Sequence, residues 1–505
     1  MGLTRISAAA LLCYAITICW QTVNSEFTTE DCKQLNNTVN VTCTNDEINY
    51  YTVNFQNDAQ FKIYITVDNE TETNSITITC QGGDEDILRI NKNLTKFSLQ
   101  HHDFASITVD GCIPFEDILK GFEIKLSTDF KLQRGITSTS LKPEHLRNLA
   151  ALSNLVLSGF EKLDEQIFAN MKSLEKLELT RFEAPLPGGV LSAIGDNLVQ
   201  LNMRDNRMHQ PPERLFTPLN RLELLDLSFN KLQTIPSGTF DQLENLIELD
   251  LSENRIELLP ADVFQSLRAL ARLYLANNRL KRLDLGTFST LNNLQQLGIE
   301  NNALEIAPIE ACKIFDGLSK LDYLELSNNS LTTYCLPHNM SSVQVSVSYN
   351  QIRELLVPTG AHQPRQLTKL NVRHNRLEHL SDEVLLYLHE SLPELSLAHN
   401  PWQCDWASSM WLAYIKFNNE RIRDLEELEC TMDNTVRYVI TINSSDIGKP
   451  ASSIPYIIAL AILGTLATLA VLAAFIYRRR ATRKSNAAPL SNSVSYSNGQ
   501  NGQYN

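Results

Sequence analysis

An asparagine recurs every 24 residues in the middle of this 505-residue chain. Each copy closes the pattern LxxLxLxxN, and four copies in phase end at Asn230, Asn254, Asn278 and Asn302. A fixed period of this length predicts a solenoid in which each unit forms one coil. The four consecutive copies make the pattern specific, which a lone LxxLxL would not be.

The residue types of the pattern follow from the needs of a stacked coil. Each coil has one short strand, and its leucines point inward onto the leucines of the coils on either side, because one coil cannot bury that face alone. The asparagine follows the strand, where the chain turns. Its amide can both donate and accept, so it can satisfy backbone groups that the turn would otherwise bury unpaired. We therefore predict an α/β leucine-rich-repeat solenoid, a horseshoe with short parallel strands on its concave face.

The pattern continues beyond the regular block, and we place the repeats at residues 119–400. Phenylalanine stands in the asparagine slot at Phe160 and Phe182, and the spacing later changes to 27, 21 and then 25 residues. Ile124 and Leu126 are candidates for a further coil in a degenerate stretch. A second periodic residue predicts an aromatic row on the convex side. Its members are Phe216, Phe240, Phe264, Phe288 and Phe315.

Residues 26–118 form the predicted N-terminal cap of the solenoid, which needs a cover over its first coil. Alternating apolar residues predict strands at Phe61–Val67 and Ile76–Cys80. The stretch Phe104–Cys112 has the repeat spacing with cysteine in the asparagine slot, so we interpret it as the first coil. Four cysteines allow three disulfide pairings, and the sequence does not choose among them. They are Cys32, Cys43, Cys80 and Cys112.

Both ends of the chain carry apolar runs that predict a membrane topology. Residues 1–25 have the layout of a signal peptide, with a signal anchor as the alternative. Residues 454–477 carry no charge and would form a helix about 36 Å long, enough to span a bilayer. A basic cluster that begins at Arg478 places the tail, 478–505, in the cytoplasm. We expect a single-pass type I protein of the plasma membrane, with an extracellular N-terminus, a polar stalk at 434–453 and a disordered tail.

Charge and modification motifs agree with this topology. All 58 acidic residues lie between the signal peptide and the membrane helix, although the net charge of the chain is only −14. Such an acidic ectodomain argues against nucleic acid as the main ligand. Seven sequons for N-glycosylation all fall on the predicted outer side. They are Asn36, Asn40, Asn69, Asn93, Asn328, Asn339 and Asn443. Small residues spaced four apart in the membrane helix can support helix pairing, so a homo- or heterodimer stays open.

Cys312 and Cys335 fall on the returning sides of neighbouring coils in the irregular part of the array. A disulfide between these coils is one interpretation. The other is a pair of buried thiols, because cysteine packs well as a small hydrophobic residue.

The end of the array, Asn400-Pro-Trp-Gln-Cys404, leads into a segment rich in tryptophan and leucine. This segment resembles the cysteine-flanked C-terminal cap of extracellular leucine-rich-repeat proteins, and we place that cap at 401–433. The family often has four cysteines here. Trp406 stands where the second would be, so the resemblance implies one bridge, between Cys404 and Cys430. We expect Trp402, Trp406 and Trp411 to cover the last coil.

The N-terminal block, with Cys80 ahead of a repeat-like Cys112, is similar to insect Toll-type immune leucine-rich-repeat ectodomains. The 28-residue tail has no room for the intracellular signalling domain of that class. The resemblance therefore implies a transmembrane leucine-rich-repeat protein without its own signalling domain.

No motif points to catalysis, to a cofactor or to a metal site. The chain contains no HExxH, GxSxG or P-loop sequence, and its ten histidines are scattered apart from one adjacent pair. We therefore expect a binding protein and not an enzyme.

The candidate ligand-binding surface lies on the concave face of the regular block. Residues between the leucines of each strand point away from the core and form columns down the coils. These columns place exposed aromatic residues among charges, which is typical of interface anchors; the alternative is an ordinary solvated face. The candidate residues are Asp226, Phe229, Asp250, Glu253, Arg272 and Tyr274. A glycan on Asn328 would restrict a concave-face ligand to the coils that precede it.

The sequence therefore predicts a cell-surface glycoprotein that binds an extracellular or cell-surface protein in adhesion or recognition. An innate-immune co-receptor or decoy is one alternative. A secreted matrix or scaffold protein is another.

Overall fold

The computed structural model describes residues 151–442, apart from gaps at 338–339, 341, 359–366, 392, 405–408 and 433. Before residue 151 it describes 39–43, 51–58, 61–68, 75–81, 106–110, 129–133, 140–146 and 149. The predicted signal peptide, membrane helix and tail lie outside these residues. Within them, no helix has the length and apolar character needed to cross a bilayer.

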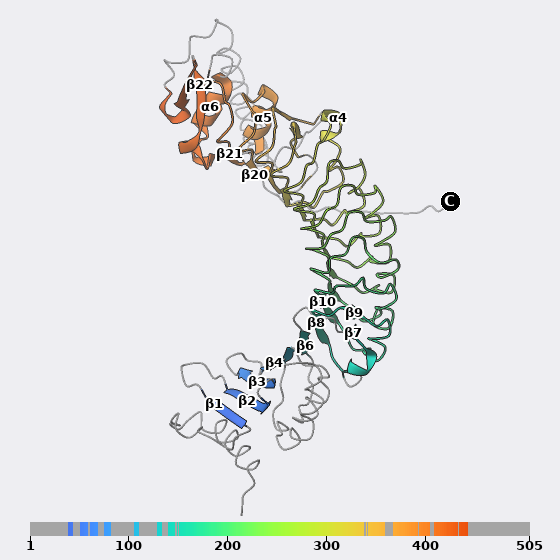
Figure 1. Cartoon of the computed structure of the whole chain (residues 1–505). Coiled ribbons are helices and arrows are strands. Elements are labelled where there is room, and N and C mark those ends of the chain that lie inside the picture. The colour runs from blue at the N-terminus through green and yellow to red at the C-terminus, as the bar shows by residue number, and fades with distance from the viewer. Residues whose placement is uncertain are drawn as a thin grey trace, which may run out of the picture.

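The repeats coil into a curved stack whose strands line the inner side (Figure 1). Neighbouring strands pair in parallel and in register, so that Leu225, Leu249, Leu273 and Leu297 occupy equivalent positions. The predicted solenoid and its parallel strands are confirmed. The strands of this stack are β8 (Asn154–Ser158), β10 (Lys176–Thr180), β11 (Gln200–Asn202), β12 (Leu224–Asp226), β13 (Glu248–Asp250), β14 (Arg272–Tyr274), β15 (Gln296–Gly298), β16 (Tyr323–Glu325), β18 (Val343–Ser346), β20 (Leu367–Asn371) and β21 (Glu394–Ser396).

The N-terminal strands extend the same sheet. β1 (Val39–Cys43), β2 (Tyr51–Asp58), β3 (Phe61–Asp68) and β4 (Ser75–Gln81) pair antiparallel in sequence, and β4 then pairs in parallel with β5 (Ser106–Asp110). The strands predicted around Phe61–Val67, Ile76–Cys80 and Ile107–Val109 are therefore confirmed as β3, β4 and β5. The pairing of the four N-terminal cysteines lies outside the described side chains and stays a prediction.

The coil expected at Ile124 and Leu126 was misplaced. The strand of this segment is β6 (Asp129–Gln133), which pairs in parallel with β5 and β8. Phe130 and Leu132 are its buried residues. The motif was missed because phenylalanine replaces the expected leucine. Two short strands, β7 (Ser140–Leu141) and β9 (Lys162–Leu163), pair on their own, and η1 (Pro143–Leu146) follows β7.

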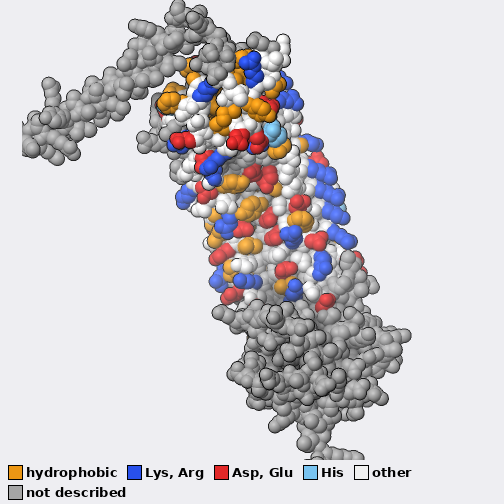
Figure 2. All heavy atoms as spheres, turned by 90° about the vertical axis from the view of Figure 1, so that its left-hand side faces the viewer, with side chains coloured by type: hydrophobic (Ala, Val, Ile, Leu, Met, Phe, Trp, Pro, Cys, Tyr) orange, Lys and Arg blue, Asp and Glu red, His pale blue; other side chains and the backbone are white. Residues whose placement is uncertain are grey.

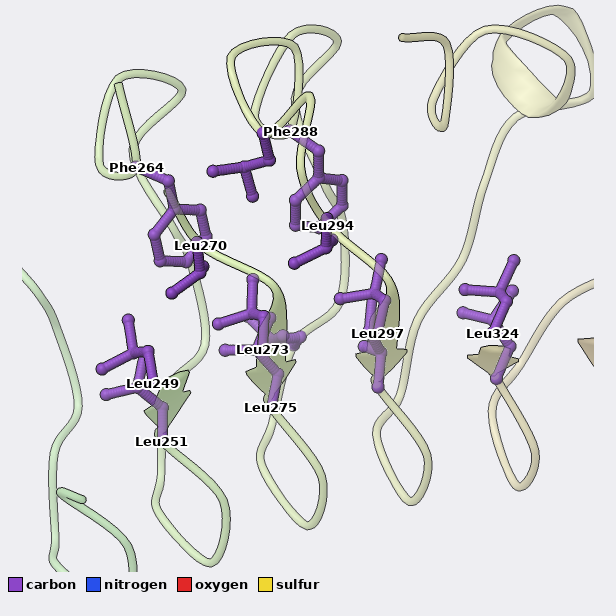
Figure 3. Packing of buried hydrophobic residues seen from close by; sticks show 14 of the residues in the cluster. Leu249, Leu251, Phe264, Leu270, Leu273, Leu275, Phe288, Leu294, Leu297 and Leu324 are labelled. Atoms are coloured by element: carbon purple, nitrogen blue, oxygen red, sulfur yellow. The ribbon is translucent and has the colours of Figure 1, made fainter. Parts of the chain in front are cut away.

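The core is a layered column of leucines backed by a row of phenylalanines. The inward leucines of the regular coils are almost fully buried, and in Figure 3 Leu249, Leu273 and Leu297 meet from adjacent coils. The predicted aromatic row is confirmed: the rings of Phe240, Phe264 and Phe288 stack with centroids 6.3–6.5 Å apart. Each ring stacks on the rings of the neighbouring coils, so the stack of coils provides the hydrophobic core that a single coil lacks.

The repeated asparagines form a ladder of hydrogen bonds. In the coil that ends at Asn254, the side-chain amide donates to the carbonyl oxygens of Leu227, 2.9 Å, and Leu251, 3.1 Å, and its oxygen accepts the N–H of Leu232 at 3.0 Å. The same contacts recur at each asparagine slot from Asn206 to Asn400. The predicted role of these amides in satisfying buried backbone groups is confirmed.

The irregular coils contain the extra elements. The long coil before Asn329 holds α4 (Pro308–Ala311), and later coils hold α5 (Asp382–Ser391) and a second small parallel sheet of β17 (Thr333–Cys335) and β19 (Glu354–Leu356). Cys312 follows α4 and is bonded to Cys335 in β17. The disulfide between coils is therefore confirmed over the alternative of two thiols.

The C-terminal cap closes the last coil. It consists of α6 (Ser409–Phe417), η3 (Asn419–Arg421), η4 (Leu425–Glu427), the hairpin of β22 (Glu429–Met432) and β23 (Thr435–Tyr438), and η5 (Val439–Thr441). The expected bridge between Cys404 and Cys430 is present. Trp402 and Trp411 are buried with ring centroids 4.8 Å apart, as predicted, whereas Trp406 lies outside the described residues.

Candidate protein-binding surface on the concave face

The concave face is built from columns because its strands are in register. Successive residues of a strand point to opposite sides, so the residues that flank each inward leucine face outward. Asp226 is paired with Asp250, Asp250 with Tyr274, and Tyr274 with Gly298. Neighbouring members of a column lie about 4.8 Å apart at the backbone. Figure 2 looks onto this face and shows acidic and apolar side chains mixed over the middle coils.

A second column follows the strands at the residue before each asparagine slot, which Phe182 occupies in the coil of Arg181. Every member from Arg181 to His399 has a positive φ, between 52° and 60°. This left-handed conformation is uncommon for residues such as Phe229 and Glu253, and it costs free energy. Hydrogen bonds from their backbone N–H groups to the next coil offset that cost: Phe229 donates to Ser252 at 3.2 Å and Glu253 to Ala276 at 2.9 Å. The turn therefore fixes the direction of each side chain at the edge of the sheet.

Two carboxylates form the centre of the candidate surface. One oxygen of Asp226 accepts the backbone N–H of Ser228 at 2.8 Å, and one oxygen of Asp250 accepts both the N–H and the hydroxyl of Ser252. Burial raises the pKa of Asp250, the hydrogen bonds from Ser252 oppose that rise, and the charge of Asp226 adds to it. The hydrogen bonds hold both carboxylates in place on the concave face.

The neighbouring strand adds a cation and an aromatic ring. Arg272 Nε lies 2.6 Å from a carboxylate oxygen of Glu248, and the same oxygen is 2.6 Å from a terminal guanidinium nitrogen. Tyr274 donates its hydroxyl to Gln296 at 3.2 Å. Partial burial raises the pKa of Tyr274, with the charge of Glu248 as the next cause. Arg272 is thus neutralised by Glu248, and Tyr274 presents a fixed, half-buried ring.

Phe229 is exposed, and its ring contacts a cation. Its side chain is 43% exposed, and the guanidinium carbon of Arg204 lies 3.9 Å from its ring centroid. A cation held this close to a ring face is attracted by the electrons of the ring. Phe229 was predicted from the sequence, whereas Arg204 was not. Because the two residues lie one coil apart, the 24-residue period could have revealed the contact.

Glu300 was not predicted from the sequence, and its side chain folds over Gly298, which follows Asp250 and Tyr274 in the same column. A Cβ atom placed on Gly298 would lie 3.0 Å from the Glu300 carboxylate and 3.7 Å from the Tyr274 ring. Burial raises the pKa of Glu300, and one of its oxygens is buried without a hydrogen-bond partner. On the next coil, Tyr323 donates its hydroxyl to Glu325 at 3.0 Å. In the sequence, the glycine at position 298 could have indicated that a side chain such as Glu300 approaches the backbone closely at this point.

The candidate residues therefore form one surface, which we call the central concave patch: Asp226, Phe229, Glu248, Asp250, Glu253, Arg272, Tyr274 and Glu300. Acidic residues outnumber cations in it, and its one arginine is paired within the patch. Two aromatic rings lie among these charges. Among the described residues, no three His, Cys, Asp or Glu side chains are arranged to hold a metal ion. Such a surface can bind cationic and apolar groups of a partner by contact.

The family model described as "Leucine rich repeat" matches residues 196–256 and 244–304. In sequence, the chain is 28% identical to Protein toll of Drosophila melanogaster over 116 residues, which are 23% of this chain and 10% of that protein. The chain thus matches about a tenth of the length of this relative. These matches confirm the leucine-rich repeats and the predicted resemblance to Toll-type ectodomains.

Two solved structures also resemble the fold. One is a complex of TLR13 with ssRNA13, at 19% identity and a TM-score of 0.46, which covers 73% of this chain and 60% of that one. The other is the Drosophila Toll–Spatzle complex, at 14% identity and a TM-score of 0.27, which covers 84% of this chain and 100% of that one. At these scores, neither overlay carries an argument about this chain.

Proposed function

We propose that this protein is a single-pass cell-surface glycoprotein that binds an extracellular or cell-surface protein through the central concave patch, in adhesion or recognition between cells. The proposal rests on one observation. Two aromatic rings, half-buried Tyr274 and exposed Phe229, lie among carboxylates that hydrogen bonds within their own coils hold in place. Aromatic anchors in a charged surround are the residue types that dominate protein interfaces.

The charge of the patch favours a basic partner. Asp226, Asp250 and Glu253 have no cation within the patch, since Arg272 is paired with Glu248. A partner that presents lysine or arginine would be steered toward this face, and the association would weaken as salt screens the charges. Nucleic acid would meet like charge here. This agrees with the sequence analysis, in which the acidic ectodomain argued against that ligand.

The test replaces the two rings, Phe229→Ala together with Tyr274→Ala, in the full-length protein displayed on cells. Loss of the anchors should lower binding of partner-bearing cells at least tenfold, because truncation of a well-packed aromatic anchor typically costs about 2 kcal/mol or more. The melting temperature should change little, since neither ring belongs to the leucine core. Cell-to-cell binding and thermal unfolding would be measured side by side.

A matched control removes two other exposed aromatic residues, Phe417 and Tyr438 of the C-terminal cap, which are 86% and 48% exposed. Phe417→Ala with Tyr438→Ala should leave binding at the wild-type level. If the concave variant binds as well as the wild type, or if the cap variant loses as much, the patch is not the binding surface.

A second candidate function is innate-immune recognition, as a co-receptor or decoy. The sequence match to Protein toll supports it. Induction of the protein by infection, together with binding of a soluble ligand, would favour this function, whereas aggregation of cells that express the protein would favour adhesion. Recovery of the protein from the medium or the matrix would instead favour a secreted scaffold.

A further inference from the structure

The edge that follows the strands carries a column of basic residues. The residue after each ladder asparagine is Arg207, Lys231, Arg255 and Arg279 in four successive coils. A row of Lys and Arg side chains is visible along one edge of the molecule in Figure 2. In the next coil this position is Ala303, so the long side chains stop there.

A pocket of about 550 Å³ opens where the column stops. Ala303, Arg279, Lys281, Asn301 and Asn328 contribute to its lining. This volume is within the range of roughly 300–1,000 Å³ that protein sites for small ligands occupy. All lining residues except Ala303 carry an amide or a charged group, and apolar atoms make up about half of the wall, so the pocket suits a ligand with both hydroxyl or amide groups and C–H faces.

The pocket also reaches the asparagine ladder. The other ladder asparagines from Asn206 to Asn400 are buried, whereas Asn302 is only partly buried and lines the pocket. Lys281 is paired with Glu257 at 3.4 Å, and for Arg279 the described residues provide no ion-pair partner. The guanidinium of Arg279 therefore keeps its donors available to a ligand in the pocket.

Asn328 is both part of this wall and the acceptor residue of the sequon Asn328-Asn329-Ser330. It is exposed and has a φ of 56°, and its backbone N–H donates to Ser348 at 2.9 Å. Its side-chain amide nitrogen donates to Asn301 Oδ1. The backbone and the side chain are both held, so a group attached to the amide nitrogen would leave it in a defined direction.

We propose that Asn328 is N-glycosylated and that the pocket beside it holds the first sugars of that glycan. The inference rests on the proposed function in one respect, since it requires the ectodomain to enter the secretory pathway. The acetamide and hydroxyl groups of the core sugars match the donors of Arg279 and the amide of Asn301. Covalent attachment gives the sugars a high effective concentration at the pocket, so weak contacts are enough to keep them there.

The attachment step is compatible with the hydrogen bond to Asn301. In transfer from a lipid-linked oligosaccharyl diphosphate, a bond forms between Asn328 Nδ2 and C1 of the sugar. The bond from C1 to the diphosphate oxygen breaks, Nδ2 gives one proton to a basic group of the transferase, and the lipid diphosphate departs with the electron pair of the broken bond. The amide nitrogen keeps its second hydrogen, which can still be donated to Asn301 Oδ1.

A seated glycan would also limit the proposed binding surface. Asn328 and Asn301 belong to the positive-φ column that borders the concave face. Sugars held in the pocket beside Asn328 would cover the edge of the concave face next to β15 and β16. They would leave β12 and β13 open, where Asp226 and Asp250 lie.

The experiment uses the full-length chain produced in secreting animal cells. Peptide mapping by mass spectrometry measures the occupancy of each sequon, and endoglycosidase digestion of the native protein measures how fast each glycan is released. Asn328 should be occupied, and its glycan should be released several-fold more slowly than the glycan on the stalk at Asn443. Denaturation should remove the difference.

Two variants test the pocket itself. Ala303→Arg continues the basic column and fills the pocket, so release from Asn328 should rise to the rate seen at Asn443. Gln351→Arg changes the residue after Asn350, which is the equivalent position in a coil that does not line the pocket, and release should stay slow. An unoccupied Asn328, or equal release rates in the wild type and Ala303→Arg, overturns the inference. If no sequon carries a glycan, the proposed function fails as well, so the two failures are distinguishable.

Discussion

The regular coils from Asn206 to Asn302 and the coils from Asn329 to Asn400 share the short strand and the left-handed turn after it, but they use their outward columns differently. In the regular coils, the positive-φ column presents Phe229 and Glu253, which are exposed. In the later coils, the same column presents Tyr349, His374 and His399, whose rings stack with centroids 4.1 and 4.2 Å apart. The same backbone position therefore carries a single ring under the Arg204 guanidinium in the regular coils and a continuous stack of rings in the later coils, and Phe229 and Tyr349 remain exposed in both regions.

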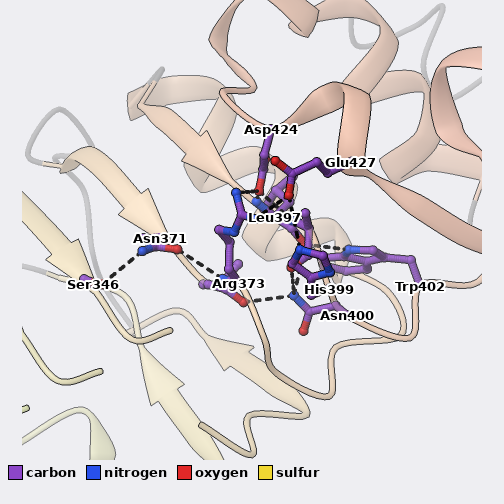
Figure 4. Close-up of polar contacts among 11 residues, drawn as sticks. Ser346, Asn371, Arg373, Leu397, His399, Asn400, Trp402, Asp424 and Glu427 are labelled. Carbon is purple, nitrogen blue, oxygen red and sulfur yellow. Dashed lines mark hydrogen bonds and ion pairs between the residues drawn. The ribbon is translucent and has the colours of Figure 1, made fainter. Parts of the chain in front are cut away.

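The C-terminal cap explains part of this difference. Buried Asp424 accepts the N–H groups of Leu397 and Ala398 at 3.0 and 2.8 Å, and Arg373 lies 3.4 Å from its carboxylate. Figure 4 shows Arg373, His399 and Glu427 meeting at the same place. His399 and Glu427 are 3.2 Å apart. Polar side chains at the end of the solenoid are thus occupied with the cap, whereas those of the central concave patch face outward.

The largest expected effect tests whether the two regions are equally rigid. Asn254→Ala and Asn350→Ala each remove one rung of the ladder, and each leaves buried carbonyl oxygens and one buried N–H group unsatisfied. Both should lower the free energy of unfolding by about 3–5 kcal/mol, since each orphaned group costs about 1–3 kcal/mol. Denaturant unfolding of both variants measures this. A much milder loss in Asn350→Ala would show that the irregular coils relax where the regular ones cannot.

An effect of about 3–4 kcal/mol is expected from the cap disulfide. The Cys404–Cys430 bond closes a segment with a sequence separation of 26, and chain entropy predicts a stabilisation of this size. Cys404→Ser with Cys430→Ser should therefore destabilise the cap. Hydrogen exchange should accelerate in the cap and the last coils while β11 to β14 keep their protection. Acceleration over the whole solenoid would mean that the two regions unfold as one unit.

The smallest expected effect concerns pH. Burial lowers the pKa of His374 from 6.5, the charges of His399 and Arg373 lower it further, and Glu427 opposes the shift. A histidine with a depressed pKa binds its proton less well in the folded state than in the unfolded state. Its contribution to stability is therefore present above pH 6.5 and is lost as pH falls toward the folded pKa.

His374→Phe keeps a ring in the stack and removes this titration. Between pH 7.5 and 5.5, the wild type should lose slightly more thermal stability than the variant. An equal loss of thermal stability in the wild type and in His374→Phe would contradict the predicted effect of His374 protonation. The equivalent position in the central block, Glu253→Gln, is a control that should not change the pH response in this window.

Much of the fold could be predicted from the sequence because each copy of the repeat pattern forms a coil of the same geometry. The leucine spacing predicts the register of the strands, and the asparagine and phenylalanine periods predict the ladder and the aromatic row. β6 was misplaced because phenylalanine replaces the expected leucine at Phe130 and, in addition, no asparagine follows Leu132 to mark the turn. Its identity emerges only from pairing with β5 and β8.

The candidate site was less predictable, since its details depend on side-chain direction. The columns located Asp226, Asp250 and Tyr274 correctly on the concave face. The left-handed turn that aims Phe229, the cation of Arg204 over its ring and the fold of Glu300 over Gly298 depend on contacts between coils. The leucine pattern does not encode these contacts. The pocket beside Asn328 was missed because a single alanine interrupts a basic column that the sequence analysis did not consider.

The most direct test of the proposed binding surface places a glycan on it. Arg279→Thr creates a sequon at Asn277, because a threonine then stands two residues after this asparagine. Asn277 belongs to the positive-φ column, one coil before Asn301 and on the coil of Tyr274. Arg279→Ala removes the same guanidinium without a sequon. With glycosylation at Asn277 verified by mass spectrometry, Arg279→Thr should abolish cell-to-cell binding while Arg279→Ala binds normally. Wild-type binding by the glycosylated Arg279→Thr protein would contradict the assignment of the central concave patch as the partner's site.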